Sequence, residues 1–460
     1  MLQLPRRLLL SCLGWAALTI ASCGGDSNTA PSNSSSSSSV VNSSTNTPAS
    51  TASGNSGGSG AGLAVKVSSS HLVDASGATL QLRGVNVSGL ESVAIQGWDP
   101  TNPWGSQTGD ASPNWSLIRS WGANAVRLPL NEASWLGLSC SDLGGGSVTV
   151  TSTGAQVQDA PGQLIEADPG DNYQATVMQS VSDANAAGLY VILDLHWAAP
   201  NNNGTPTCPT VQNAMADADH SSDFWTSLAN TFKGNPAVLF ELFNEPFIGE
   251  SSQSSSDTQS AWYYILNGGA TEAALLAAGT PGTISFNWVT TGYQQLLDAI
   301  RATGATNVIL AGTDSWTQTM TAWLQYAPKD PLGQLAASWH PYPADPYGPA
   351  NQVICPGLTQ CSAQEMTAVQ GILAAGYPVV ATEFGDTVTA SPGNTAPWAS
   401  VLLPFADQNG ISYLGWTWDV WSGATANVLI TDEAGDPTNG YGTYVQQHYL
   451  CVAAGTNSCP

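Results

Sequence analysis

Positive charge is scarce in this sequence. Only 9 of its 460 residues are Lys or Arg, against 33 Asp or Glu, so the formal net charge is −24. Charged residues of either sign make up just 9 % of the chain. A nucleic-acid partner requires a basic surface that neutralises phosphates, and this chain has too few cations to supply one. The composition therefore argues against a nucleic-acid partner.

A long apolar run is missing at the N-terminus, where a membrane anchor would lie. Arg6 and Arg7 are followed by an apolar run from Leu8 to Ile20. This run is too short for a membrane-spanning helix, which needs about 20 apolar residues. Its length and its basic start are typical of an export signal that is removed from the mature protein.

The four residues that end at Cys23 read Ile-Ala-Ser-Cys and resemble the bacterial lipobox. The resemblance implies a lipoprotein signal peptide over residues 1–22, cleavage before Cys23 and a lipid anchor on its thiol. Gly24, in place of Asp, favours the outer membrane in organisms that sort lipoproteins by that position. An ordinary cleaved signal with an incidental Cys23 is the alternative. In both cases we expect an extracellular or cell-surface protein, with an outer-membrane lipoprotein as the first hypothesis.

Apolar residues are nearly absent from residues 23–62, which consist mainly of Ser, Thr, Asn and Gly. Such a segment cannot bury a core, so we expect a flexible linker between the anchor and the folded part. Periodic apolar residues begin near Leu63. We therefore expect one large domain over residues 63–460 and a monomeric protein.

The sequence contains 8 Cys but no Cys-x-x-Cys pair, which argues against a zinc site. Cys12 and Cys23 lie in the signal region, and an even number of Cys remains. In an exported chain this predicts disulfides. Two pairs are close in sequence and leave a third, so we expect Cys355–Cys361, Cys451–Cys459 and Cys140–Cys208. We expect neither a metal nor a cofactor.

Beyond residue 63 one unit recurs, which is a helical segment, a Gly and a short apolar run. An apolar run without alternation is typical of a parallel strand that is buried on both faces. We expect core strands at residues 82–87, 125–130, 190–196, 238–243, 308–311, 335–340, 379–383 and 413–418. Alternating strands and helices predict a parallel α/β sheet, and eight such units predict a (β/α)8 TIM barrel.

Three longer segments interrupt this pattern, at residues 131–172, 247–287 and 341–362, and each follows a strand. Because parallel strands all end on one face, these long loops should wall a cleft on the carboxyl face. An N-terminal β-hairpin around Asp74–Gly77 should precede the barrel. A doubly wound open sheet is the alternative fold, but Gly84–Gly89 is a poor match to its phosphate-binding loop.

Polar side chains stand at the carboxyl ends of several of these strands. Asn244 and Glu245 follow the apolar run Val-Leu-Phe-Glu-Leu-Phe, and Pro246 then ends the strand because it cannot donate to a ladder. The other candidates at strand ends are Arg127, Asp194, His196, His340, Tyr342, Glu383, Trp416 and Trp418. Polar residues from distant strands that meet on one rim are what a barrel active site requires.

This set of residues, in this order, resembles glycoside hydrolase family 5, in the clan of retaining barrel enzymes with catalytic Glu on strands four and seven. The matching residues are Arg127, His196, Asn244, Glu245, His340, Tyr342, Glu383 and Trp416. The resemblance implies that residues 63–460 are a glycoside hydrolase catalytic domain. Hydrolysis of a glycosidic bond needs one carboxyl to protonate the leaving oxygen and a second group to attack or to activate water. The two Glu residues fit that requirement.

The resemblance implies a role for each residue. Glu245 would be the general acid and then the base, and Glu383 the nucleophile, with their carboxyl groups roughly 5–5.5 Å apart. Arg127 would favour the ionised form of Glu383. Asn244 would hold the sugar 2-hydroxyl, and Tyr342 would donate to Glu383. His196 and His340 would line the site, and Trp416 would be the sugar platform beside a cis peptide to Thr417.

The substrate that this resemblance implies is a β-linked polysaccharide, with a retaining endo-β-1,4-glucanase (a cellulase) as the leading reading. A β-mannanase or another β-glycanase of the clan is the alternative enzyme, and a lipoprotein that binds glycans without cleaving them is the alternative class. Fold and catalytic pair are shared across many activities and do not decide between them. Trp418 competes with Trp416 as the platform. Other Trp residues of the rim are candidate sugar contacts or core residues, namely Trp98, Trp104, Trp135, Trp197, Trp316 and Trp421.

Overall fold

The structure is a computed structural model of the chain. It describes residues 62–92, 102–104, 112–142, 148–150, 156–158, 164–208, 212–248, 261–271, 288–342, 360–386, 388, 396–421, 424, 426–456 and 459–460. The expected signal peptide, Cys23 and most of the expected linker lie outside these residues. Within the described part, no helix has the length and apolar character that a membrane span requires.

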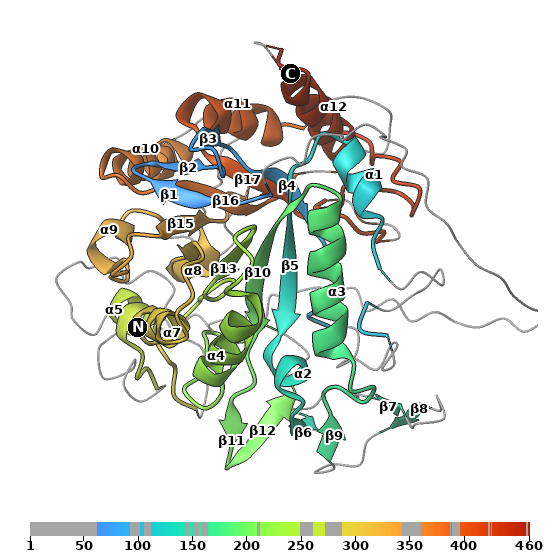
Figure 1. The fold of residues 1–460 in the computed structure, drawn as a ribbon, viewed down its shortest axis with the longest axis vertical. Helices are drawn as coiled ribbons and strands as arrows, with labels where there is room; N and C mark the ends of the chain where they lie inside the picture. The colour runs from blue at the N-terminus through green and yellow to red at the C-terminus, as the bar shows by residue number, and fades with distance from the viewer. Residues whose placement is uncertain are drawn as a thin grey trace, which may run out of the picture. The chain divides into compact units, whose positions relative to one another are not determined.

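Eight parallel strands form a closed barrel, which confirms the (β/α)8 fold (Figure 1). They follow one another in chain order, and the last pairs with the first. The strands are β4 (Arg83–Asn86), β5 (Ala125–Asn131), β10 (Tyr190–Trp197), β13 (Val238–Glu241), β14 (Ile309–Ala311), β15 (Leu335–Trp339), β16 (Val379–Phe384) and β17 (Ser412–Gly415). Each lies within, or at most a residue or two beyond, one of the predicted apolar runs.

Helices connect these strands and cover the outside of the barrel (Figure 1). Phe224, Leu228 and Phe232 follow one another at four-residue spacing on α4, which puts them on one helix face, and that face is buried. Glycine at 410 ends α11 with φ 68°, a left-handed conformation that side chains disfavour. In the described residues the helices are α1 (Trp115–Ser120), α2 (Glu132–Leu136), α3 (Tyr173–Ala186), α4 (Ser221–Phe232), α5 (Ala261–Asn267), α7 (Tyr293–Ala302), α8 (Asp314–Thr317), α9 (Trp323–Tyr326), α10 (Gln360–Ala374), α11 (Ala399–Asn409) and α12 (Tyr441–Ala453).

The lower half of the barrel interior is apolar. Inward residues such as Ile192, Leu239 and Leu310 form one buried cluster with Val65 and Leu72, which come from the segment before the barrel. That segment folds as a three-stranded antiparallel sheet, so the predicted hairpin gains one strand, in the order β1 (Lys66–Ser68), β2 (His71–Val73) and β3 (Thr79–Leu80). The sheet therefore closes the amino-terminal end of the barrel.

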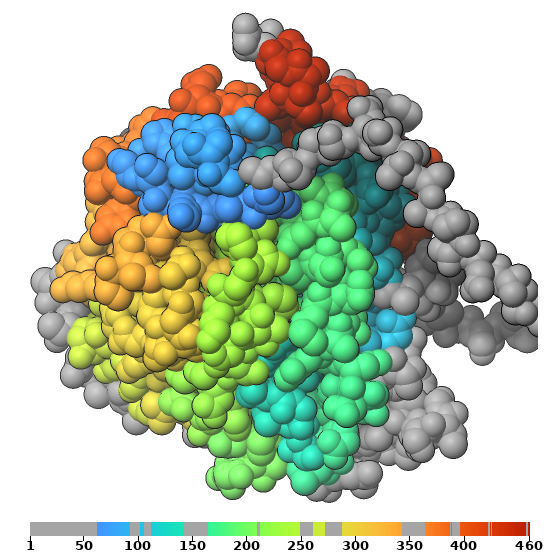
Figure 2. All heavy atoms as spheres, in the orientation of Figure 1, coloured from blue at the N-terminus to red at the C-terminus, as the bar shows by residue number. Residues whose placement is uncertain are grey.

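Hydrogen bonds fasten this sheet to the barrel wall. The backbone N–H of Val67 donates to Oε1 of Gln334 (2.9 Å), just before β15. The side chain of Gln81 donates to Asp407 (3.1 Å) on α11. In Figure 2 the atoms of the sheet, in blue, accordingly meet the orange segments of the C-terminal third without a break.

A small four-stranded sheet lies beyond the carboxyl end of β5 (Figure 1). It has the order β11 (Asn201–Asn202), β12 (Thr205–Cys208), β6 (Ser139–Asp142) and β9 (Leu164–Glu166), and the predicted disulfide Cys140–Cys208 joins two of its strands. The loops after β5 and β10 are thus tied together at the rim, beside α2 (Glu132–Leu136). The disulfide Cys451–Cys459 is also present, whereas Cys355 lies outside the described residues.

Candidate active site

Arg127 lies at the centre of the upper half of the barrel and is fully buried. Its guanidinium donates to Glu241 (2.6 Å), to Glu383 (2.6 Å) and to Asn244 (2.7 Å). It also contacts Asp194 (2.9 Å), and Asn86 accepts from its Nη1 atom (3.0 Å). One cation therefore serves three carboxylates from strands β10, β13 and β16, which raises the pKa of Arg127 despite its burial.

Glu383 accepts hydrogen bonds on both carboxylate oxygens. Arg127 holds Oε1, and the hydroxyl of Tyr342 donates to Oε2 at 2.7 Å, which is the contact that the family resemblance implied. Burial alone would raise the pKa of Glu383, but the charges of His340 and Arg127 outweigh it and hold that pKa below the ordinary value. The site therefore keeps Glu383 ionised.

Glu245 lies opposite, one residue beyond Asn244 on the loop that follows β13. Its Oε1 atom lies 2.8 Å from Nδ1 of His340, and its side chain is 14 % exposed, against 4 % for Glu383. Burial and the charge of Glu383 raise the pKa of Glu245, and His340 and His196 only partly offset them. Glu245 therefore retains a proton at pH values where Glu383 has lost its own.

The two carboxylates are close enough to act on one bond. One oxygen of Glu245, one of Glu383 and one ring nitrogen of His340 all lie within 4.8 Å of one another. Enzymes that cleave glycosides with retention keep their carboxyls roughly 5–5.5 Å apart, and inverting enzymes keep them roughly 6.5–9.5 Å apart to admit a water. The spacing at this rim fits the retaining arrangement.

Trp416 and His196 form one flat wall of the site. Their rings are stacked, with centroids 5.6 Å apart and planes 8° from parallel. His196 is held in turn by Asp194, whose Oδ2 lies 2.7 Å from its Nδ1 atom. The peptide between Trp416 and Thr417 is cis, as the resemblance implied.

Trp418 belongs to the core and not to the site. It is only 6 % exposed and packs edge-on against Trp121 at 4.7 Å. The remaining Trp residues of the rim also differ in burial. Trp104 and Trp135 are buried, Trp421 is 43 % exposed, and Trp316 stacks on Phe247 at 5.2 Å beside the Glu245 loop. Trp98 lies outside the described residues.

The sequence patterns did not single out Glu241, Asn86 or Thr382. Glu241 is fully buried below Arg127, and Asn86 and Thr382 lie beside it on β4 and β16. The signal for Glu241 was present, since it is the one carboxylate in the apolar run that leads to Asn244. A buried carboxylate that interrupts such a run needs a buried partner.

Two groups of acidic and His side chains in the described part have metal-ligand spacing. One is Glu245, His340 and Glu383, the pair already described with its neighbour. The other is Glu132, Asp217 and His220, where Ser221 donates to Glu132 (2.6 Å) and the backbone of Ala199 to Glu132 (3.0 Å) and Asp217 (3.1 Å). Protein donors thus already occupy these carboxylates, and the absence of a resident metal stays a prediction.

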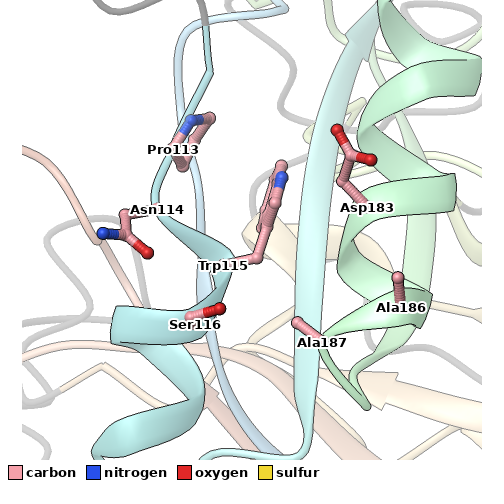
Figure 3. A pocket seen from close by; sticks show the side chains of 7 residues that line it. All are labelled: Pro113, Asn114, Trp115, Ser116, Asp183, Ala186 and Ala187. Atoms are coloured by element: carbon pink, nitrogen blue, oxygen red, sulfur yellow. The ribbon is translucent and has the colours of Figure 1, made fainter.

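An open pocket of about 370 Å³ lies elsewhere, on the outside of the barrel between the start of α1 and the end of α3. Trp115, Asp183 and Ala187 are among the residues that line it (Figure 3). None of the predicted site residues lies there, so the candidate chemistry belongs to the barrel rim.

Comparison with known proteins agrees with this geometry. Residues 73–422 match the family model "Cellulase (glycosyl hydrolase family 5)". Endoglucanase C of Evansella cellulosilytica is 24 % identical over 360 residues, which are 75 % of this chain and 34 % of that protein. The major extracellular endoglucanase of Xanthomonas campestris is 24 % identical over 390 residues, which are 79 % of this chain and 67 % of that protein. The match with this chain thus covers about a third of the length of the first of these relatives, Endoglucanase C.

A solved structure has the same fold. The β-glucanase of Saccharophagus degradans, in complex with cellotetraose, is 20 % identical, and the match covers 86 % of this chain and 95 % of that one with a TM-score of 0.52. The fold, the residues at the strand ends and the match over residues 73–422 lead to one conclusion. The chain belongs to glycosyl hydrolase family 5.

Proposed function

We propose that this protein hydrolyses β-glycosidic bonds with retention, and that it is an endo-β-1,4-glucanase. The observation that carries the proposal is the pair Glu245 and Glu383, whose oxygens lie within 4.8 Å and whose pKa values are shifted in opposite directions. One carboxyl that holds its proton and one that has lost it are the two groups that double displacement needs.

In the first step the Glu383 carboxylate attacks the anomeric carbon while Glu245 gives its proton to the leaving glycosidic oxygen. The bond to that oxygen breaks, and a covalent glycosyl-enzyme forms on Glu383. In the second step Glu245, now ionised, takes a proton from water, and that water attacks the same carbon. The bond to Glu383 breaks, so two inversions give net retention.

The neighbouring side chains position the sugar and the charges in this proposal. Arg127 and Tyr342 keep Glu383 ionised and fixed. Asn244, held through its Oδ1 atom by Arg127, directs its amide N–H groups to the sugar 2-hydroxyl. Trp416, flat against His196, offers the apolar face of its ring to a pyranose at the point of cleavage. His340 contacts Glu245 and remains hydrogen-bonded to it while Glu245 gives up its proton and takes one back.

The substrate class follows from the relatives, several of which are named endoglucanases. We propose a soluble or amorphous β-1,4-glucan, bound across an open rim by the partly exposed Trp197, Trp316 and Trp421. A β-mannanase or another β-glycanase of the clan is the competing enzyme, and a non-catalytic glycan-binding lipoprotein is the competing class.

Release of reducing ends from carboxymethylcellulose, galactomannan, xylan and laminarin, measured side by side, tests this proposal. We expect the fastest release from carboxymethylcellulose, with a rapid fall in viscosity because chains are cut internally. Glu383→Gln should abolish it. Faster release from galactomannan would make the protein a mannanase. Binding to these glycans without any release would refute an enzyme.

We also propose the location of the protein. Residues 1–22 would be a lipoprotein signal, Cys23 the lipidated residue, residues 23–62 a tether and residues 63–460 a monomeric catalytic domain on the cell surface. In a bacterial host, Cys23→Ala should move the protein from the membrane fraction to the soluble fraction and abolish labelling with a fatty acid. Equal labelling of both forms would refute the anchor.

A further inference from the structure

Glu241 is a third carboxylate of the active-site region, and the mechanism above does not use it. It is fully buried at the end of β13, four residues before Glu245. It lies below the rim and contacts neither of the oxygens that would act on the sugar. A buried carboxylate costs several kcal/mol unless it is paired and hydrogen-bonded, so its contacts need an explanation.

One oxygen of Glu241 accepts a hydrogen bond from Arg127. Nε of Arg127 donates to Oε2 of Glu241 at 2.6 Å, while Nη1 of the same guanidinium donates to Glu383 at 2.6 Å. A guanidinium is planar and rigid, so a fixed Nε also fixes the direction of Nη1. Glu241, together with Asp194 and Asn244, therefore fixes the orientation of the guanidinium that holds Glu383.

The other oxygen of Glu241 accepts hydrogen bonds from two hydroxyl groups, and one of these hydroxyls also contacts His340. Ser338 donates to Oε1 at 2.6 Å and Thr382 at 2.9 Å. An ionised carboxylate only accepts hydrogen bonds, so the Thr382 hydroxyl is the donor in its contact with Glu241. The lone pair of that hydroxyl is left for Nε2 of His340, 2.9 Å away, which must then carry a proton.

The remaining ring nitrogen of His340 meets Glu245. Because Nε2 is committed to Thr382, Nδ1 is the ring atom that is left to hydrogen-bond Oε1 of Glu245, 2.8 Å away. Glu241 is thus connected to both members of the pair, through Arg127 to Glu383 and through Thr382 and His340 to Glu245.

We propose that Glu241 is a positioning residue for the two-step reaction, which holds Arg127 against Glu383 and, through the hydroxyl of Thr382, holds His340 with Nδ1 directed at Glu245. The role of the catalytic pair rests on the function proposed above. Glu241 itself touches neither substrate nor reacting atoms, so its effect passes through its two neighbours.

Charge supports this arrangement. Burial alone would raise the pKa of Glu241, but Arg127 and then His340 outweigh it and lower that pKa to about 2. Burial lowers the pKa of His340, and the carboxylates around it reverse this and raise it to about 10. The charged or titratable groups that face this cluster are Arg127, Asp194, His196, Glu245, Tyr293, His340, Tyr342 and Glu383.

Glu241→Gln is the direct test, because it removes the charge and keeps the volume. His340 loses a negative neighbour, so its pKa should fall by about one unit or more. His340 is then neutral over a wider pH range, Glu245 loses a positive neighbour, and the alkaline limb of kcat/KM should move to higher pH. Misplaced catalytic groups should lower kcat roughly ten- to a hundredfold with little change in KM.

The matched control is Asp330→Asn. Asp330 is also a buried carboxylate bound by an arginine through two contacts, from Nε (2.8 Å) and Nη2 (2.9 Å) of Arg301, but on the outside of the barrel. This substitution should reduce stability and leave the pH profile unchanged. Thr382→Val is the second test, because it removes the hydroxyl between Glu241 and His340 while Nε2 of His340 stays 3.7 Å from Oε1 of Glu241. It should lower the pKa of His340 without changing the Arg127 contact.

The pKa of His340 is read from nitrogen NMR of the protein labelled at its 5 His residues, with His340→Gln to assign the signal. This measurement needs no substrate, so it stands even if no glycan is cleaved and the proposed function fails. A His340 titration that moves no further in Glu241→Gln and Thr382→Val than in Asp330→Asn would overturn the proposal. If Glu241→Gln does not fold, Thr382→Val decides alone.

Discussion

Nη1 of Arg127 lies 2.6 Å from Oε1 of Glu383, in an ion pair whose two side chains are 0 % and 4 % exposed. The chain has only 9 basic residues, and this one is placed where it holds a carboxylate in its ionised form. The other oxygen of Glu383 is held by a neutral donor, the hydroxyl of Tyr342. The two contacts differ in charge, so their contributions can be separated.

Tyr342→Phe should move the acid limb of the pH profile to higher pH. The hydrogen bond from Tyr342 lowers the pKa of Glu383, so its removal raises that pKa. A hydrogen bond to a charged group contributes about 1.5 kcal/mol, which corresponds to about one pH unit. The measurement is kcat/KM against pH. An alkaline limb that moves instead of the acid limb would show that the two carboxyl roles are reversed.

Glu383→Gln and Glu245→Gln should differ on a substrate with a good leaving group. Glu383→Gln lacks the nucleophile, so it should be inactive on every glycoside. Glu245→Gln lacks only the proton donor, so an activated aryl glycoside should still give a burst of aglycone followed by slow hydrolysis. Azide, which attacks without a base, should speed the slow phase of Glu245→Gln alone. Absence of a burst and of azide rescue in both variants would contradict the assignment.

Loss of the rim disulfide should destabilise the protein more than loss of the C-terminal one. Cys140 and Cys208 are 68 residues apart, and Cys451 and Cys459 are 8 apart. The loop-entropy relation gives roughly 4 kcal/mol for the first pair and roughly 2.5 kcal/mol for the second. Thermal unfolding of the two double Cys→Ser variants measures the difference. Equal losses would mean that the unfolded chain is already compact around the longer loop.

The buried pair Glu132 and Asp217 should make the fold more stable in acid. Burial, with the charge and hydrogen bond of Asp217, raises the pKa of Glu132 well above its ordinary 4.5. A raised pKa in the folded state means stability that is complete below 4.5 and is lost as the pH rises toward the folded value. In urea unfolding at a series of acidic to neutral pH values, the midpoint of the native protein should therefore fall relative to that of Glu132→Gln as the pH rises.

The control for this prediction is Glu166→Gln, which changes an exposed carboxylate that accepts a hydrogen bond from Ser139. It should leave the pH dependence of the unfolding midpoint as it is. A difference in midpoint between the native protein and Glu132→Gln that stays constant from acidic to neutral pH would contradict the raised pKa of Glu132.

The barrel could be predicted from sequence because each core strand is a mostly apolar run near a Gly. The same property hid Glu241. A parallel strand that is buried on both faces shows no alternation, so the sequence does not tell which residues point into the barrel and which meet the helices. Glu245 and Glu383 stood out because they lie at or just beyond the ends of the predicted apolar runs, whereas Glu241 lies inside the run Val238–Phe243.

The rim was the least predictable part. Its small sheet contains polar strands such as Ser139–Asp142 and Thr205–Cys208, which lack both an apolar run and a clear alternation. The pairing of the loops after β5 and β10 was expected only from their Cys residues. Trp416 and Trp418 could not be ranked from their spacing, because only the packing of Trp418 on Trp121 places it in the core.

The apolar cluster that includes Val65 and Leu72 forms the floor of the barrel at its amino-terminal end. Each strand therefore contributes residues to this apolar floor and other residues to the rim. The residues that pack the core and the residues of the rim lie on the same strands, but they are different residues. Rim segments such as Asn201–Asn202 can therefore be exchanged without repacking Leu239 or Leu310 in the floor. Such a scaffold is suited to laboratory evolution of substrate range, since a library confined to the rim loops leaves the foundation of the fold intact.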